Sequence, residues 1–174
     1  MEHVAPRGLE TRMFERILVA LDGGRASRCA LHKAVDIARS ANAKVTAVFV
    51  LDHHLTAVDV LRDISEERIF RLFMHEEAEN ELRYARKMFS SNGVKGRTSM
   101  IDTSGESVAD AICRAAITEK ADLVVIGHRE PTAFQRIFGS VTSKVMKKSD
   151  ALVLLVSEGE EDHTRAGHNV SDGR

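Results

Sequence analysis

The amino-acid sequence predicts an α/β domain in which helices cover a parallel sheet. Short apolar runs recur along the chain, and segments whose apolar residues follow a helical spacing separate them. A continuous apolar run is typical of a strand that is buried on both faces, as the strands of parallel sheets are. Because strands and helices alternate throughout, and because 174 residues suit one domain, the sequence favours a single domain with helices on both faces of its sheet.

The first half of the chain supplies two predicted strands with a helix between them. The first strand follows Arg16, reads I-L-V-A-L and ends at a carboxylate, Asp22. Two glycines then favour a turn, and Ser27 is expected to cap a helix. The second strand is expected over 43–51, and 53–61 is expected to be a loop.

A long amphipathic helix is expected over 65–90, with acidic and basic residues spaced so that they can pair along it. Its apolar stripe is expected to face the core and consists of Ile69, Phe73, Leu82, Ala85 and Phe89. The remaining elements are expected in this order: a strand over 98–101, a helix capped by Ser104 or Ser107, a strand over 123–126, a loop over 128–138, a helix over 140–148 with Val141, Val145 and Met146 inward, and a strand over 152–156.

The two ends of the chain lack this periodicity. Residues 1–13 are polar and are expected to form a flexible N-terminal extension. Residues 158–174 are acidic and then rich in Gly, His, Asn and Asp, which predicts a disordered tail. The domain itself is expected to cover 14–157.

Composition disfavours several classes of partner. The chain has 25 basic and 26 acidic residues, so it lacks the basic excess of a broad nucleic-acid surface, although a local basic patch stays open. No apolar run approaches the ~20 residues of a membrane span. Cys29 and Cys113 stand alone on predicted helices among apolar neighbours, so they are expected to be core residues of a cytoplasmic protein. We therefore expect neither a nucleic-acid nor a membrane partner.

The candidate ligand site lies where the strands end. In open sheets of this type, ligands bind beyond the carboxyl ends of the strands, at the point where the strand order reverses. Asp22, Asp52, Asp102 and Gly127 all come at such ends. Asp22 can accept a hydrogen bond from an adenine amine or a ribose hydroxyl, or it can form an Asx-turn with the glycines that follow it.

The segment Gly127–Thr142 is the strongest candidate for binding phosphate. It joins a strand end to a helix start through a loop with two arginines, and it closes with the tetrapeptide G-S-V-T. The first amides of a helix are unpaired and carry the positive end of its dipole, so they bind phosphate where a glycine lets the backbone approach. The alternative is that Gly139 is a turn residue and Ser140 a plain N-cap.

Other motifs in the sequence are weaker evidence for a function. The segment 93–96 matches the G-x-x-G loop of KH domains, but a plain break in the chain also explains its glycines. Asp52, His53, His54 and His75 have poor spacing for metal ligands, so solvated loop histidines and no metal site are expected. There is no G-x-S-x-G elbow and no H-E-x-x-H, so a catalytic nucleophile or a zinc protease has little support.

Three segments together resemble the universal stress protein family. They are Ile17–Gly23 (ILVALDG), Ala43–Val50 (AKVTAVFV), and Ala121–Gly127 (ADLVVIG) followed by Gly139–Thr142 (GSVT). The resemblance covers about residues 14–157. It implies a single doubly wound, Rossmann-like domain whose five-stranded parallel sheet has the strand order 3-2-1-4-5. It also implies a homodimer formed by antiparallel pairing of the last strands, here Leu152–Val156, an apolar edge that needs covering.

One branch of the family binds ATP through the motif G-x-x-G, nine residues, then G-[S/T]. This sequence departs from the motif twice, because the second glycine is Glu130 and because Gly139 follows Gly127 one residue early. A glutamate beside a triphosphate repels it, whereas Arg129 and Arg136 offset that charge.

The resemblance also implies a set of ligand-binding residues. Ala20 and Asp22, with the second-strand backbone near Ala47 and Val48, would face adenine and ribose. The phosphates would be held by Gly127, Arg129, Gly139, Ser140, Val141 and Thr142. The ligand would be ATP, ADP or AMP, with or without magnesium, and no resident metal or catalytic residue is expected.

Three hypotheses for the function follow. The first is a stress-response regulator that binds an adenine nucleotide with little or no turnover. The second is a nucleotide-free dimer of the same family that docks on an unknown protein partner. The third is a slow ATPase or a nucleotidyltransferase-like enzyme, for which His128 and Arg129 are the local candidates, although the H-x-G-H signature of adenylyl-transferring relatives is absent.

Overall fold

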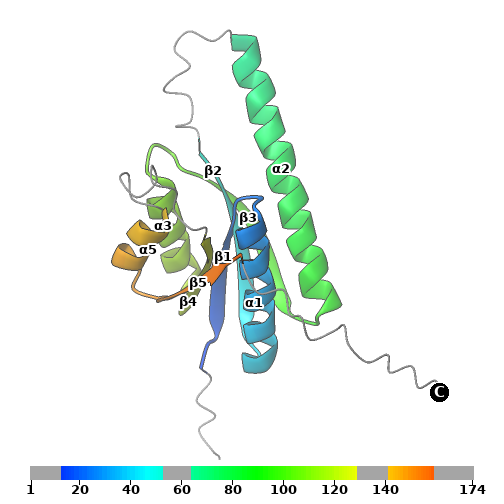
Figure 1. Cartoon of the computed structure of the whole chain (residues 1–174), viewed down its shortest axis with the longest axis vertical. Coiled ribbons are helices and arrows are strands. Elements are labelled where there is room, and N and C mark those ends of the chain that lie inside the picture. Colours follow the sequence, from blue (N-terminus) through cyan, green and yellow to red (C-terminus); the bar gives the residue numbers. More distant parts are fainter. Residues whose placement is uncertain (1–12, 53–63, 129–140, 159–174) are drawn as a thin grey trace, which may run out of the picture.

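The computed structural model describes residues 13–52, 64–128 and 141–158. In these ranges five strands pair in parallel in the order β3-β2-β1-β4-β5, with helices on both faces of the sheet (Figure 1). The predicted fold class and strand order are confirmed. In chain order the elements are β1 (Arg16–Leu21), α1 (Arg25–Ala41), β2 (Lys44–Leu51), α2 (Ile64–Ser91), β3 (Lys95–Asp102), α3 (Val108–Glu119), β4 (Leu123–His128), α5 (Val141–Lys148) and β5 (Leu152–Ser157).

Most element boundaries agree with the prediction to within a few residues. The strand β3 differs most, since it begins three residues before the expected 98–101. Four predicted segments lie wholly or almost wholly outside the described residues. They are the loops over 53–61 and 128–138 and the extensions 1–13 and 158–174.

Two apolar clusters lie on opposite faces of the sheet. Alternate residues of β1 divide between them: Ile17, Val19 and Leu21 pack against α1 and α2. Leu18 and Ala20 pack on the side of α3 and α5. Because helices cover both faces, every position of the strand is buried, which is why its apolar run is continuous.

The start of α1 differs from the prediction, and the start of α3 agrees with it. Gly24 is the N-cap of α1, and Ser27 lies in its first turn. The Ser27 hydroxyl donates to the Gly24 carbonyl and accepts from the Asp22 amide, so it ties the helix to the end of β1 instead of capping it. In α3, Ser107 is the N-cap, and its hydroxyl accepts from the Asp110 amide.

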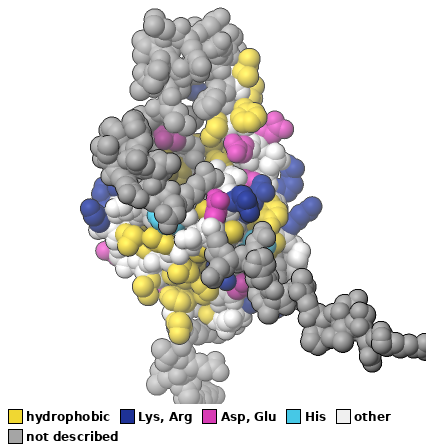
Figure 2. Space-filling model, in the orientation of Figure 1, with side chains coloured by type: hydrophobic (Ala, Val, Ile, Leu, Met, Phe, Trp, Pro, Cys, Tyr) yellow, Lys and Arg dark blue, Asp and Glu magenta, His cyan; other side chains and the backbone are white. Residues whose placement is uncertain are grey.

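Helix α2 is longer than the sheet that it covers. Leu82, Ala85 and Phe89 are buried, but Ile69 and Phe73 are 67% and 63% exposed, so the predicted apolar stripe is wrong for the first half of the helix. A helix of 28 residues is about 42 Å long and a strand of eight is about 26 Å. The helix therefore runs past the carboxyl ends of the strands (Figure 1), and its apolar side chains there emerge on the surface (Figure 2). No helix in the described ranges, α2 included, combines the length and apolarity needed to cross a bilayer.

The two glycines of the 93–96 segment have separate structural causes. Gly93 follows α2 with a φ of +65°, a conformation that favours glycine. Gly96 lies in β3, where a Cβ atom would come within 2.2 Å of the Phe89 ring of α2. The segment therefore joins a helix to a strand, so the prediction of a plain break in the chain is confirmed and the KH alternative is excluded.

Helix α5 packs through one narrow face. Val145 is fully buried, as predicted, and Thr142 lies beside it on the inward face. Val141 and Met146 are exposed, so their prediction as inward residues is wrong. The reason is that this helix has only eight residues and covers the edge of the sheet, where a single row of side chains reaches the core.

The two cysteines differ in environment. Cys29 is exposed on α1, so its prediction as a core residue is wrong, because it lies on the face of α1 that points away from the sheet. Cys113 of α3 is partly buried against the apolar cluster on its side of the sheet. Burial raises the pKa of the Cys113 thiol, and the Asp110 carboxylate raises it further.

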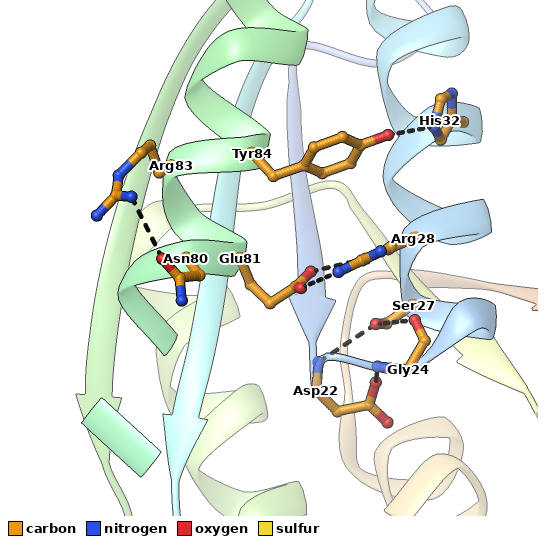
Figure 3. Close-up of polar contacts among 9 residues, drawn as sticks. All are labelled: Asp22, Gly24, Ser27, Arg28, His32, Asn80, Glu81, Arg83 and Tyr84. Carbon is orange, nitrogen blue, oxygen red and sulfur yellow. Dashed lines mark hydrogen bonds and ion pairs between the residues drawn. The ribbon is translucent and has the colours of Figure 1, made fainter. Parts of the chain in front are cut away.

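A polar cluster joins α1 to α2 (Figure 3). The Arg28 guanidinium donates two hydrogen bonds to the Glu81 carboxylate, and it lies 5.5 Å from the centroid of the Tyr84 ring. The Tyr84 hydroxyl lies 2.9 Å from Nε2 of His32. The Glu81 side chain is only 6% exposed, and Arg28 supplies hydrogen bonds to its buried carboxylate. The hydrogen bond to Glu81 raises the pKa of Arg28.

Candidate functional site

The carboxyl ends of the strands bring several predicted ligand residues to one edge of the sheet. β1 and β4 are neighbours there. The helix that follows β1 covers one face, and the helix that precedes β4 covers the other. This reversal is the switch point at which open α/β sheets bind ligands. Ala20 pairs with Ile126, so Asp22 and Gly127 come at the ends of neighbouring strands.

Asp22 forms the Asx-turn that its sequence context allows. Its Oδ1 atom accepts a hydrogen bond of 2.8 Å from the Gly24 amide, and its own amide donates to the Ser27 hydroxyl at 3.3 Å (Figure 3). The side chain is nevertheless exposed. A ligand at this edge would therefore meet a carboxylate that already holds the start of α1 in place.

Gly127 is a glycine for a packing reason. A Cβ atom at this position would lie 2.4 Å from the carbonyl carbon of Ala26 and 2.4 Å from the amide nitrogen of Ser27. Both atoms are backbone atoms of the first turn of α1, so no side-chain rotation can relieve the contact. The glycine lets α1 begin directly against the end of β4, whether or not a ligand is bound.

A carboxylate that follows the last strand also reaches the start of α1. Oε1 of Glu158, the residue after β5, accepts a hydrogen bond of 3.1 Å from the Ala26 amide in the first turn of α1. A carboxylate is stabilised by the positive end of a helix dipole. This contact differs from the prediction that 158–174 is a disordered tail, because Glu158 binds the start of α1. The one signal in the sequence is an acidic residue directly after the last predicted strand.

A cavity of about 420 Å³ lies at the carboxyl edge of the sheet, lined by the residue that follows β2, by the segment that leads from β3 into α3, and by the first turns of α3 and α5. The residues that define its chemistry are Asp52, Glu106, Ser107, Val108, Val141 and Lys144. The first turns of two helices and one ammonium group make part of this wall positive. The carboxylates of Asp52 and Glu106 add acceptors, so the cavity suits an anion that also carries hydrogen-bond donors.

Lys144 is exposed on α5 and forms part of the cavity wall. It lies one turn into α5, and within the described residues it has no ion pair. Glu106, by contrast, accepts a hydrogen bond of 2.7 Å from Nε of Arg114. The Lys144 ammonium therefore supplies positive charge to the wall, and its charge also contributes to the lowered pKa of Asp110.

An ion pair fixes the two helices that bound the cavity. The Asp110 carboxylate of α3 accepts hydrogen bonds of 2.6 Å from the Lys148 ammonium of α5 and from the Ser107 hydroxyl. The hydrogen bond from Lys148 lowers the pKa of Asp110, and that from Ser107 lowers it further. The same pair raises the pKa of Lys148. The contact sets the spacing between the first turn of α3 and the last turn of α5.

Three residues implied by the resemblance lie inside the sheet. Ala20 and Val48 are buried in the cluster on the side of α3, and Ala47 is buried in the cluster on the side of α1. β2 pairs with β1 on one side and with β3 on the other along this stretch. Their side chains belong to the core, and their contact with a nucleotide stays a prediction.

The predicted phosphate segment is only partly within the described residues. Val141 and Thr142 are the first residues of α5, the former exposed at the cavity and the latter buried. Arg129, Gly139 and Ser140 lie outside the described residues. Among the described residues there is no group of three or more His, Cys, Asp or Glu side chains that could hold a metal ion.

Comparison with known proteins places the chain in a family. Residues 13–157 match the model of the Universal stress protein family. A universal stress protein of Methanocaldococcus jannaschii is 32% identical over 151 residues, which cover 86% of each chain.

Solved structures agree with this match. A protein from the universal stress protein family of Burkholderia pseudomallei has a TM-score of 0.66 at 28% identity and covers 83% of this chain and 96% of its own. The universal stress protein of Archaeoglobus fulgidus in complex with dAMP has a TM-score of 0.58 at 24% identity, with coverage of 82% and 97%. The sequence match spans the sheet and its helices from before β1 to the end of β5, so the chain belongs to the universal stress protein family.

Proposed function

We propose that the protein is a stress-response regulator that binds an adenine nucleotide (ATP, ADP or AMP) at the carboxyl edge of its sheet, with little or no turnover. The observation that carries the proposal is the cavity of about 420 Å³ bounded by the first turns of α3 and α5. This volume lies in the range of small-molecule pockets. The dAMP held by the Archaeoglobus fulgidus relative is the reason for choosing adenine nucleotides within this size class.

Each part of the nucleotide has a candidate contact. The Lys144 ammonium and the first amides of α5 would hold phosphate, together with the predicted segment 139–140. Asp22, at the switch point, would accept from the nucleoside. Low turnover is expected because hydrolysis needs a positioned base, and the Glu106 carboxylate of the cavity is already held by Arg114.

The second candidate is a nucleotide-free dimer that acts through a protein partner. Two internal contacts favour it. Asp22 is engaged by the Gly24 amide, and the Ala26 amide is engaged by Glu158, so part of the switch point is satisfied by the chain itself. In the sequence, Glu130 would add a negative charge to the phosphate loop.

Both candidates share a proposed homodimer through β5, residues 152–156. This strand is an edge of the sheet, and Leu152 and Leu154 are 65% and 36% exposed. Hydrophobic side chains gather on the part of the surface that lies over α5 and β5 (Figure 2). An apolar edge strand is stabilised by pairing with a second copy. Both cysteines are free thiols, which fits a dimer that acts in the reducing cytoplasm.

Calorimetry on the full chain tests the nucleotide proposal. ATP, ADP and AMP are titrated with and without magnesium, into the natural chain and into two charge-matched variants of α5, Lys144→Glu and Lys147→Glu. Lys144 lines the cavity and Lys147 is exposed outside it. A hydrogen bond to a charged group contributes about 1.5–3 kcal/mol, so Lys144→Glu is expected to weaken binding at least roughly tenfold.

The two variants separate the outcomes. Micromolar binding that Lys144→Glu weakens and Lys147→Glu leaves unchanged supports the nucleotide regulator. The absence of any heat at millimolar nucleotide would reject it and favour the nucleotide-free dimer. Release of inorganic phosphate at the rate of an ordinary ATPase would reject the expectation of low turnover.

A further inference from the structure

A second cavity, of about 410 Å³, lies at the opposite edge of the sheet, where β1, β2 and β3 begin. The side chains that define it are Arg16, Lys44, Thr46, Lys95, Arg97 and Glu119. Its wall is formed by the first residues of three strands and by the last turn of α3. It is therefore separated from the carboxyl-edge site by the length of the sheet.

Three basic residues form a row across the floor of this cavity. Arg16 of β1 pairs in register with Lys44 of β2, and Lys44 pairs in register with Lys95 of β3. Parallel strands in register place such side chains on the same face, about 4.8 Å from one strand to the next, so the row spans about 10 Å. It lies on the face that α3 covers, because Leu18, two residues after Arg16, packs in the cluster of α3.

The negative charges beside the row are engaged elsewhere. The Glu119 carboxylate accepts hydrogen bonds from the Arg97 guanidinium and from the Thr46 hydroxyl. The Asp122 carboxylate accepts from the backbone amides of Glu15 and Arg16. The last turn of α3 is closed by its own cap, since the amides of residues 120 and 121 bond its carbonyls.

The three cations of the row have no counter-ion among the residues that the structure describes. There the side chains of Arg16, Lys44 and Lys95 are exposed and make no hydrogen bond or ion pair. Like charges directly opposite one another on neighbouring strands destabilise a sheet. Repulsion among the three cations therefore destabilises this edge of the sheet, and an anionic ligand would relieve that repulsion.

We propose that this amino-edge basic row binds a compact polyanion, a small molecule that carries two or three phosphate groups. The cavity is of small-ligand size, and a row of about 10 Å can face successive phosphates with one cation each. Arg97 and Thr46, one row further along the strands, would add a guanidinium and a hydroxyl at its side. The site is independent of the carboxyl-edge nucleotide site, because it uses none of the same residues.

Titration of the ¹⁵N-labelled full chain with inorganic tripolyphosphate tests this proposal. The amide signals of residues 16–17, 44–46 and 95–97 are expected to shift. The double variant Lys44→Glu/Lys95→Glu is expected to raise the Kd at least roughly tenfold. The control Lys33→Glu/Lys87→Glu makes the same change of charge on the exposed surfaces of α1 and α2, and it is expected to raise the Kd less than roughly twofold.

Folding does not confound this test. In the double variant, position 44 would carry the charge opposite to that of Arg16, while positions 44 and 95 would still be a like-charged pair. One of the two repulsive contacts of the row becomes attractive, so the double variant is expected to unfold at the same temperature as the natural chain or a higher one. A Kd that the double variant leaves unchanged would overturn the proposal. Shifts confined to residues 22–27 and 141–144 would also overturn it, since they would place the anion at the other edge. Tighter binding of an RNA or DNA oligonucleotide through the same lysines would replace the small ligand with nucleic acid.

Discussion

Gly127 and Asp22 show how closely the fold and the candidate site are joined at the level of single residues. Gly127 leaves room for the backbone of Ala26 and Ser27, and Asp22 binds the Gly24 amide. Both residues therefore hold the start of α1 at the switch point. Packing alone is enough to explain a glycine at 127 and an aspartate at 22. These residue types in a sequence are therefore stronger evidence for the fold than for nucleotide binding.

Gly127→Ala is expected to destabilise the fold by about 1–3 kcal/mol, the usual cost of overpacking a tight contact. The new Cβ atom would lie 2.4 Å from backbone atoms of α1, so the helix must move away from β4. Urea unfolding measures the loss. Ser157→Ala, at the exposed end of β5, is the control and is expected to change stability by less than about 0.5 kcal/mol. An equal stability of the glycine and alanine chains would contradict the packing explanation.

At the level of helices, ion pairs fix spacings that apolar contacts alone leave loose. Arg28 and Glu81 join α1 to α2 on one face of the sheet, and Asp110 and Lys148 join α3 to α5 on the other. The two pairs differ in burial. The Glu81 side chain is buried, whereas the side chains of Asp110 and Lys148 are both partly open to solvent. They are therefore expected to respond differently to mutation and to pH.

Glu81→Gln is expected to destabilise the fold by about 1–2 kcal/mol. The substitution leaves the Arg28 guanidinium without its charged partner, and the half-exposed position of Arg28 keeps the loss below that of a fully buried pair. The matched control is Glu79→Gln on the same helix, because the pair of Glu79 with Arg86 is exposed on both sides. Its expected loss in urea unfolding is below about 0.5 kcal/mol. Equal losses of unfolding free energy for the two variants would show that the burial of Glu81 does not strengthen its pair with Arg28.

The pair of Asp110 and Lys148 gives a dependence of stability on pH. The folded-state pKa of Asp110 is lower than its unfolded value, so its stabilisation is fully present above the unfolded pKa and is lost as the pH falls through the folded pKa. Asp110→Asn is therefore expected to be less stable than the natural chain at pH 7 and equally stable in strong acid. Urea unfolding between pH 7 and pH 2 measures the difference. A gap between the two chains that stays constant down to the lowest pH would contradict it.

At the level of the whole molecule, the sheet presents two edges of strand ends and two edge strands. The carboxyl edge carries the proposed nucleotide cavity, and the amino edge carries the basic row. β3 and β5 are the edge strands. The amino end of β3 carries Lys95 and lies beside α2, whereas β5 exposes leucines, so the apolar strand is the one that needs a partner.

The double variant Leu152→Lys/Leu154→Lys is expected to be a monomer. Two ammonium groups on the apolar strand would repel those of a second copy and would remove the apolar area that the pairing buries. Light scattering is expected to give twice 19.2 kDa for the natural chain and 19.2 kDa for the variant. Leu72→Lys/Phe73→Lys, on the exposed half of α2, is the control and is expected to remain a dimer. A natural chain that scatters as a monomer would reject the β5 interface.

The sequence was enough to predict most of the sheet, because buried parallel strands need apolar runs and β1, β2, β4 and β5 each contain one. The edge strand β3 lacks such a run, and its boundaries were the least accurate of the five. The sequence was not enough to predict how far α2 is covered. Ile69 and Phe73 follow the same helical spacing as Leu82 and Phe89, and only the length of the strands decides which pair is buried. Similarly, Met146 had the right spacing for an inward residue, but the core reaches α5 only at Thr142 and Val145.

The candidate site was predictable in position and only partly in composition. Asp22 and Gly127 were predictable because each follows an apolar strand, and open α/β sheets bind ligands beyond the carboxyl ends of their strands. The contact of Glu158 with Ala26 and the place of Lys144 in the cavity depend on how distant elements meet, and no local pattern encodes that. The basic row likewise exists only once the register of three strands is known.

The most direct test of the central claim is a crystal structure of the full chain grown with AMP or ATP. We expect density for the nucleotide at the carboxyl edge, with its phosphate within hydrogen-bond distance of Lys144 and the first turn of α5, and with Asp22 near the nucleoside. A cavity that stays empty at millimolar nucleotide, or a nucleotide bound at any other place, would contradict it.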